Sequence, residues 1–193
     1  MKIRAIQTAY DKRLFRSRAE ARWAVFFKCL EIQYEYEPEG IEMNGVRYLP
    51  DFKLSVKHHG KYEPLWVEIK PAEWNDDDKL GKLAEYLPSS HRLTKLPSLE
   101  AYLNIVENTG IAGEIECLWG KGDNDDVGAD YGYMFCVCPD CETAGFEFNG
   151  RAARLKCCAQ ISNAKGHEDK NYQYDHPIIM NAIQHALSER FGT

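Results

Sequence analysis

Two acidic side chains and one lysine occur at spacings that suit phosphate chemistry. Asp51 lies in the segment YLPDF, and Glu68 and Lys70 lie in the segment WVEIK. Because side chains on a strand repeat every two residues, Glu68 and Lys70 should share one face, about 7 Å apart. Two carboxylates suit a hard cation such as Mg²⁺, which keeps water and substrate phosphate in its shell. The metal would activate a water, and the lysine would orient that water or stabilise the transition state.

Two predicted strands, 46–56 and 63–70, bring these groups together if they pair as a hairpin. Apolar residues alternate in the first strand and should face the core: Phe52, Leu54 and Val56. Asp51 then points to the opposite face, where it can meet the other two groups. The turn between the strands contains His58 and His59, which we expect to be exposed.

The pattern resembles the PD-(D/E)xK nuclease superfamily. Pro50-Asp51 is followed by Glu68-Ile69-Lys70, within the longer series FRSR-x-E…YEYEPE…YLPDF…WVEIKP. That series is similar to the nuclease subunits of bacterial transposons and to related phage nucleases. The resemblance covers residues 15 to about 75 well and 76–119 loosely.

The resemblance implies a restriction-endonuclease-like αβββαβ core and hydrolysis of DNA phosphodiesters with Mg²⁺ or Mn²⁺. It also implies a metal-binding glutamate on the first helix, a place that Glu20 fits. Glu20, Asp51 and Glu68 would then hold one or two metal ions, and Lys70 would assist the water. A phage or mobile-element origin, and a protein partner or a homodimer, are expected on the same ground.

Each of these residues also has a purely structural interpretation. Ser17 and Glu20 fit a capping box, in which the glutamate satisfies a helix-end amide. Asp51 could be a turn residue after a proline, and Glu68 and Lys70 could form an exposed cross-strand pair. A second hypothesis for the whole chain is therefore a non-catalytic DNA- or protein-binding adaptor or inhibitor on a nuclease-like fold. The net charge of −6 favours that alternative.

Positive charge is concentrated at the N-terminus. Residues 1–28 carry eight Lys and Arg against two acids, a net +6, so the other 165 residues carry −12. A basic segment on an acidic body can contact nucleic-acid phosphates locally. Arg16, Arg18 and Arg22 are the candidates for gripping the DNA backbone, and a solvated helix face is the equally ranked alternative.

Five of the seven cysteines fall within 23 residues, which is typical of a metal site in a chain without a secretory signal. Cys138 and Cys141 form a C-x-x-C knuckle, and a cysteine pair follows fifteen residues later. A structural Zn²⁺ needs four ligands. Adjacent cysteines rarely share one ion, so the predicted set contains only one member of the pair. That set is Cys138, Cys141, Cys157 or Cys158, and His167, with Cys136 in reserve. Reduced, partly buried thiols are the alternative.

The cysteine region reads as a zinc ribbon with a short hairpin at 145–151 between its two ligand pairs. Basic residues there could contact nucleic acid. Alternatively, the metal could serve only to stabilise a segment that has little hydrophobic core of its own. The predicted domains are a nuclease-like core at 1–119, a linker at 120–129, and a zinc-binding ribbon with a C-terminal helix at 130–193.

Length and composition predict a globular α/β protein. The chain has 193 residues, of which 44% are hydrophobic and 28% charged. Helical periodicity and end signals predict helices over 15–30, 76–87, 98–109 and 177–190, and strands over 33–39 and 114–119. No apolar run is long enough for a membrane helix, and no signal peptide is visible. We expect a cytoplasmic protein, in the host cytoplasm if phage encoded.

Overall fold

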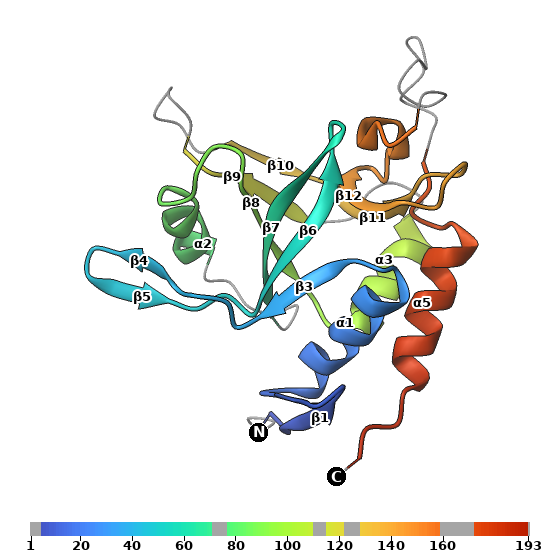
Figure 1. The fold of residues 1–193 in the computed structure, drawn as a ribbon, viewed down its shortest axis with the longest axis horizontal. Coiled ribbons are helices and arrows are strands. Elements are labelled where there is room, and N and C mark those ends of the chain that lie inside the picture. The colour runs from blue at the N-terminus through green and yellow to red at the C-terminus, as the bar shows by residue number, and fades with distance from the viewer. Residues whose placement is uncertain (1–4, 71–76, 110–114, 122–127, 159–171, 193) are drawn as a thin grey trace.

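The computed structural model describes all residues except 1–4, 71–76, 110–114, 122–127, 159–171 and 193 (Figure 1). It is a mixed α/β fold, as predicted. Its strands are β1 Thr8–Tyr10, β2 Arg13–Phe15, β3 Gln33–Tyr36, β4 Ile41–Met43, β5 Val46–Tyr48, β6 Phe52–His58, β7 Lys61–Ile69, β8 Arg92–Leu96, β9 Glu116–Trp119, β10 Ala129–Tyr131, β11 Tyr133–Val137 and β12 Ala144–Phe148. Its helices are α1 Arg18–Cys29, α2 Asp77–Ala84, α3 Leu99–Thr109, the short 3₁₀ helix η1 Ala152–Leu155, and α5 Pro177–Ser188.

Strand β6 is the centre of an eight-stranded sheet with the order β10-β9-β8-β7-β6-β12-β11. On one side β6 forms the predicted antiparallel hairpin with β7, with Phe52 opposite Val67. On its other side it pairs antiparallel with β3, and at its far end in parallel with β12. Strand β8 runs parallel to β7, which places α2 in the crossover between them. The hairpin therefore lies in the middle of the sheet, where its backbone is fixed on both sides.

The two end strands of the sheet, β10 and β11, follow each other directly in the chain, so the sheet is strongly curved. Strand β10 pairs with β9 and β11 pairs with β12, yet only Gly132 separates β10 from β11. Gly132 has a φ of 91°, a left-handed conformation that glycine adopts without steric cost. The N–H groups of Gly132 and Tyr133 both donate to the carbonyl of Ile115, at 2.9 and 3.1 Å. The bend at Gly132 thus closes the sheet into a ring.

Helices α1, α3 and α5 cover one face of the sheet (Figure 1). The face of α1 that packs on the sheet is rich in aromatic residues because Trp23, Phe26 and Phe27 recur at helical spacing. The rings of Phe27 and Phe52 pack edge to face with centroids 5.3 Å apart. The indole of Trp23 also donates a hydrogen bond to the carbonyl of Pro97, at 2.8 Å. This core positions the start of α1 beside the start of β6.

A smaller cluster lies around α2 and strands β8 and β9. Its buried members are Tyr48, Trp66, Leu80, Leu83, Ala84, Leu87, Leu93 and Leu118. Trp66 lies in β7 between Leu65 and Val67, which belong to the larger core, so β7 is covered on both faces. That double cover explains why the second half of β7 is a continuous buried run.

Most predicted helices and strands are present, but the predicted strand over 46–56 is two strands, β5 and β6, in different sheets, and strand β8 was not predicted. A further difference lies in the cysteine region. Residues 145–151 do not form a hairpin by themselves. Ala144–Phe148 is a single strand, β12, whose partner β11 precedes the knuckle. The region predicted as an appended ribbon shares the main sheet through β12, and its helix α5 packs in the same core as α1.

The tip of the β6–β7 hairpin rests on η1. His58 is half-buried there, which differs from the prediction, whereas His59 is exposed as predicted. The N–H groups of His59 and Gly60 donate to the carbonyls of Arg154 and Leu155, at 3.0 and 2.9 Å. His58 Nδ1 lies 2.5 Å from an oxygen of the fully buried Glu147. A buried carboxylate requires such a partner, so the β12 glutamate holds the histidine against the fold.

Gly145, where β12 meets β6, has no room for a side chain. A Cβ at this position would lie 2.2 Å from Leu155 Cδ2 and 2.9 Å from the carbonyl oxygen of Lys57. We expect Gly145→Ala to lower the free energy of unfolding by roughly 2–3 kcal/mol because the crowded groups must move apart. Urea denaturation followed by circular dichroism measures the change.

The matched control for that substitution is Gly81→Ala in α2. A Cβ at Gly81 would meet nothing within 4 Å. Alanine is also favoured over glycine in a helix by up to about 1 kcal/mol, so this variant should be as stable as the parent or more so. Equal stability of the two variants would contradict the close packing of β12 against η1.

Candidate functional site: an acidic cluster and a four-cysteine cluster

Helix α1 begins with a closed network of hydrogen bonds around Glu20. Ser17 is the N-cap, and its Oγ accepts from the N–H of Glu20 at 3.1 Å while its hydroxyl donates to Glu20 Oε1 at 2.8 Å. Glu20 Oε2 accepts from the Tyr36 hydroxyl at 2.6 Å and from the N–H of Arg16 at 3.1 Å. Glu20 therefore caps the helix, and its carboxylate is buried with both oxygens bonded within the protein.

Asp51 and Glu68 are joined to each other through backbone amides. The N–H of Asp51 donates to Glu68 Oε2 at 3.2 Å, and the N–H of Ile69 donates to Asp51 Oδ2 at 2.7 Å. Both carboxylates are almost fully buried, with 3% and 4% of their surface exposed. The antiparallel register of β6 and β7 produces this arrangement, since Asp51 precedes the residue that faces Val67.

Lys70 supplies the positive charge predicted next to these acids. Its Nζ lies 2.8 Å from Glu68 Oε1, and its backbone N–H donates to the carbonyl of Leu96 in β8 at 2.9 Å. Burial and the neighbouring charge of Glu68 together raise the pKa of Tyr48, which therefore stays a neutral phenol. Glu68 thus lies between an ammonium and a phenol.

Arg16 enters the same cluster from the segment before α1. Its Nη2 pairs with Asp51 Oδ1, and its Nε lies 2.8 Å from Glu37 Oε1. Arg16 was predicted as a contact for DNA, whereas the structure places its guanidinium on a buried carboxylate. Glu37, which directly follows β3, was not predicted as part of this cluster.

Burial and the repulsion of Glu68 raise the pKa of Asp51 to about 6. Glu20 adds to this effect, and the Ile69 amide and the Arg16 guanidinium oppose it. Two carboxylates held close together in a low-dielectric environment favour any added cation, because a cation relieves their repulsion. The cluster is therefore an attractive position for positive charge.

The structure brings Asp51, Glu68 and Lys70 together and sets Glu20 next to them. The carboxylates of Glu20, Asp51 and Glu68 do not, however, converge on one position that a single metal ion could occupy. Within the described part of the chain, only a cysteine cluster has at least three metal-binding side chains whose ligand atoms all lie within 4.8 Å of one another. The physical reason is that Glu20 faces its own N-cap and Tyr36. The donor set of Asp51 and Glu68 still fits a hard cation, because it consists of carboxylate oxygens.

The other two arginines predicted to contact DNA are placed differently from each other. Arg18 is exposed in the first turn of α1. Arg22 is half-buried one turn later and pairs with Glu100 at the start of α3. Arg18 therefore remains a candidate for a DNA contact, and Arg22 links two helices.

Four cysteine thiols form a second, separate cluster. Cys138 Sγ lies 3.6 Å from Cys158 Sγ, and Cys141 Sγ lies 3.5 Å from Cys157 Sγ. Four Zn–S bonds of about 2.3 Å in a tetrahedron place the sulfurs about 3.8 Å apart. The thiols therefore have nearly the spacing of a tetrahedral metal site before any ion is added, and the cluster could hold a metal ion.

The knuckle is built by the turn that joins β11 to β12. The N–H of Cys138 donates to the carbonyl of Thr143 at 2.9 Å, and the N–H of Glu142 donates back to the carbonyl of Cys138 at 2.8 Å. The Thr143 hydroxyl, 3.2 Å from Cys141 Sγ, is the main cause that lowers the pKa of Cys141 to about 7. Burial raises the pKa of Cys138. A metal ion would hold all four sulfurs as thiolates.

The cluster differs from the predicted ligand set in one respect. Cys157 and Cys158 both belong to it, although we expected only one of these neighbours to take part. They can diverge because they follow η1, whose C-cap Lys156 is left-handed with a φ of 50°. His167 lies outside the described residues. Cys136, the reserve ligand, is buried in β11 against Ala152 and Leu155.

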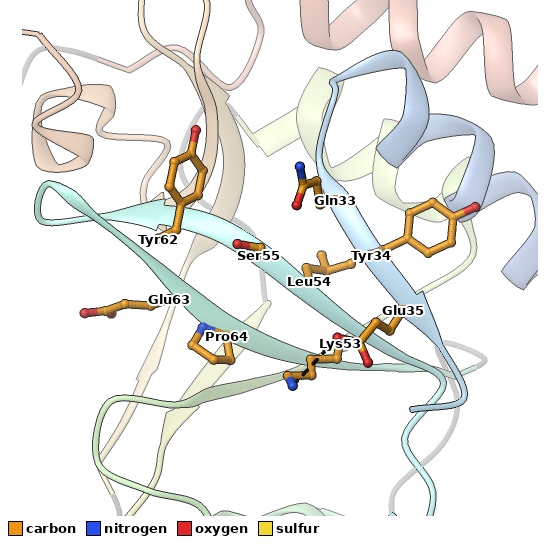
Figure 2. A pocket seen from close by; sticks show the side chains of 9 residues that line it. All are labelled: Gln33, Tyr34, Glu35, Lys53, Leu54, Ser55, Tyr62, Glu63 and Pro64. Carbon is orange, nitrogen blue, oxygen red and sulfur yellow. Dashed lines mark ion pairs between the residues drawn. The ribbon is translucent and has the colours of Figure 1, made fainter. Parts of the chain in front are cut away.

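A hollow of about 350 Å³ with a mixed polar and apolar lining lies on the face of β3, β6 and β7 away from α1 (Figure 2). In Figure 2 the side chains of Glu35 and Lys53 form an ion pair across its floor, with a distance of 3.8 Å. Tyr62 stands at its edge and also lines a second hollow, of about 340 Å³, that reaches Cys141. The lining of the first hollow contains two acids, Glu35 and Glu63, and one lysine, Lys53, so it offers no built site for an anion.

Comparison with known proteins provides no family for this chain: no protein-family model, no curated protein and no solved structure matches it. In the described part of the chain, none of the helices combines the length and the apolar character needed to cross a bilayer. The functional argument therefore depends on the geometry of the two clusters and on the sequence pattern.

Proposed function

We propose that the chain is a DNA endonuclease that hydrolyses phosphodiester bonds with Mg²⁺ or Mn²⁺. One observation carries the proposal: two buried carboxylates, Asp51 and Glu68, meet beside the ammonium of Lys70 at the end of a central hairpin. Two carboxylates held this close in a low-dielectric environment repel each other, and a divalent cation would relieve that repulsion more than a single side-chain charge does. The resemblance of this segment to PD-(D/E)xK nucleases agrees with that chemistry.

In this proposal Asp51 and Glu68 hold the metal ion, and Glu20 orders the first turn of α1 beside them. A metal ion held there would supply activation of a water and neutralisation of charge on the phosphate. Lys70 Nζ, fixed 2.8 Å from Glu68 Oε1, is placed to hold the attacking water at the edge of the site. Tyr48 keeps bulk water from Glu68, because it is buried and neutral.

The test is cleavage of DNA by the zinc-loaded protein. Supercoiled plasmid, linear duplex, nicked, branched and single-stranded DNA are each incubated with Mg²⁺, Mn²⁺ or Ca²⁺. We expect cleavage with Mg²⁺ and Mn²⁺ and little with Ca²⁺, whose larger and more flexible coordination shell suits hydrolysis poorly. Absence of cleavage on all five substrates, also after addition of proteins encoded by neighbouring genes, would contradict the proposal.

A second candidate function is a non-catalytic adaptor or inhibitor that binds DNA or protein. The observation that favours it is that the acids already have partners within the protein. Arg16 neutralises Asp51, and the hydroxyls of Ser17 and Tyr36 donate to the two oxygens of Glu20. This alternative predicts binding of DNA or of a partner with no metal-dependent cleavage. The same assay, read together with a gel-shift measurement, separates the two functions.

For the cysteine cluster we propose a structural Zn²⁺ held by Cys138, Cys141, Cys157 and Cys158. Four thiolates in a tetrahedron are typical of closed structural zinc sites. The ion would join the β11–β12 turn to the chain after η1. Because η1 supports the tip of the β6–β7 hairpin, zinc would stabilise the strands that carry the acidic cluster.

A further inference from the structure

Arg16 is held at its backbone and at the end of its side chain by different partners. Its N–H is shared between Glu20 Oε2 and the Tyr36 hydroxyl, at 3.1 and 3.0 Å. Its guanidinium bridges two carboxylates, Asp51 and Glu37, while 51% of the side chain remains exposed. The backbone anchor therefore does not depend on where the guanidinium points.

The two carboxylates that Arg16 bridges are not equivalent. Asp51 is 4% exposed at its side chain, and Glu37 is 32% exposed. Asp51 Oδ2 accepts from the Ile69 amide, and Oδ1 is paired with Arg16, so a divalent cation that binds Oδ1 must take the place of the guanidinium. A divalent cation and Arg16 thus compete for one atom.

Glu37 can keep the arginine at the site after such a competition. Its N–H donates to the carbonyl of Asp51 at 2.9 Å, and its backbone is left-handed with a φ of 46°. A residue other than glycine holds that conformation only where its surroundings fix it. The Glu37 carboxylate is therefore positioned relative to Asp51, and it binds Nε of Arg16 rather than the Nη group that faces Asp51.

We propose that Arg16 would leave Asp51 when a metal ion binds there and, still bound to Glu37, would contact the scissile phosphate. This inference rests on the proposed nuclease function. The released Nη groups form a planar fork that suits two phosphate oxygens. Without metal, Arg16 is therefore bound to the proposed metal ligand Asp51. After its release it acts as a catalytic residue, and Glu37 is the residue that positions it. Metal and DNA must then bind cooperatively, because each favours the displaced arginine.

The first measurement is Mn²⁺ binding to the zinc-loaded protein without DNA, followed by electron paramagnetic resonance. Arg16→Met removes the competing charge and keeps the length of the side chain. We expect it to lower the dissociation constant for Mn²⁺ about five- to tenfold. Arg13→Met is the matched control, since Arg13 is exposed three residues earlier and packs over the ring of Tyr34, and its affinity for Mn²⁺ should equal that of the parent.

The second measurement separates charge from the phosphate contact. Arg16→Lys keeps the charge, so its affinity for Mn²⁺ should stay near that of the parent. It lacks the planar fork, so cleavage at saturating Mn²⁺ should fall about 100-fold in kcat with little change in KM. A short DNA duplex should tighten Mn²⁺ binding to the parent and not to Arg16→Met.

The outcomes distinguish this inference from the proposed function. Equal Mn²⁺ affinity of the parent and Arg16→Met would overturn the exchange, whereas metal-dependent cleavage would still support the nuclease. No Mn²⁺ bound by the parent, by Arg16→Met or by the parent with DNA would overturn both. Melting curves of each variant establish that the comparison is made between folded proteins.

Discussion

Cys138→Ser is expected to release the metal ion from the four-cysteine cluster and to lower the melting temperature by about 10 °C. Cys138 is fully buried at the end of β11, and its sulfur lies 3.6 Å from that of Cys158. Structural zinc sites supply folding free energy directly. A loss on the order of 4 kcal/mol corresponds to roughly 10 °C for a chain of this size.

The effect should spread beyond the knuckle along a defined route. Without the ion, Cys157 and Cys158 are no longer tied to β11, and η1 loses its support next to the hairpin tip. Amide hydrogen exchange should therefore quicken at His59 and Gly60, whose N–H groups donate to η1. Mass spectrometry measures the loss of zinc, and calorimetry measures the change in melting temperature.

Cys29→Ser is the matched control because Cys29 is an exposed thiol on α1 and is not one of the four cluster cysteines. It should keep one zinc per chain and the parental melting temperature. If purified parent protein contained no zinc and bound none on titration, or if Cys138→Ser melted with the control, the metal assignment would be wrong. The thiols would then be a reduced, partly buried group.

Asp51→Asn is expected to abolish cleavage, with a fall of about 1000-fold or more. The amide can still accept from the Ile69 N–H, so the strand geometry is preserved. It lacks the negative charge that holds a divalent cation, and each tenfold loss of rate corresponds to about 1.4 kcal/mol in the transition state. Plasmid cleavage under single-turnover conditions measures the loss. Wild-type rates in Asp51→Asn would exclude Asp51 from catalysis.

The same substitution is expected to stabilise the fold at neutral pH. The raised pKa of Asp51, from 3.8 to about 6, means that the folded state binds this proton more tightly than the unfolded state. The aspartate therefore makes the native protein less stable as pH rises from about 4 to about 6, by up to about 3 kcal/mol. Asp51→Asn should be the more stable protein above pH 6, and its advantage should vanish near pH 4.

Urea denaturation between pH 4 and pH 8, in buffer without added divalent cation, measures that difference. Asp130→Asn is the control, because Asp130 is exposed on β10 and its substitution should shift stability little at any pH. A constant difference between Asp51→Asn and the parent across this range would show that the charge of Asp51 is not the cause.

The central hairpin could be predicted from the sequence because its signals are local. Phe52, Leu54 and Val56 alternate with polar residues, and the same period places Asp51 opposite them. The contact of Asp51 with Glu68 follows from that register once the turn is known. The helices were predictable for the same reason, since their caps Ser17 and Ser98 lie in the sequence next to the apolar stripes that they precede.

The rest depended on contacts between distant segments. Glu147 holds His58 across 89 residues of sequence, and no local pattern in either segment indicates that pairing. The entry of β12 into the main sheet beside β6 is of the same kind. Two residues of the acidic cluster have structural roles: Glu20 caps α1, and Arg16 is the counter-ion of Asp51. These structural roles compete with the functional roles predicted for the same residues. The Glu37 carboxylate was missed because it follows the end of β3, in the YEYEPE segment, where the sequence shows only a strand end.

Closure of the sheet at Gly132 has a consequence for solubility. An open sheet presents unpaired N–H and C=O groups on its outer strands, and a second molecule can pair with them. Here one bent segment, β10 and β11, provides partners to β9 and β12 together, so both strands are paired within the same molecule. A bulky β-branched residue in place of Gly132 would disfavour the bend between β10 and β11. Strands β9 and β12 would then lose partners, and their unpaired edges could pair with other copies of the protein.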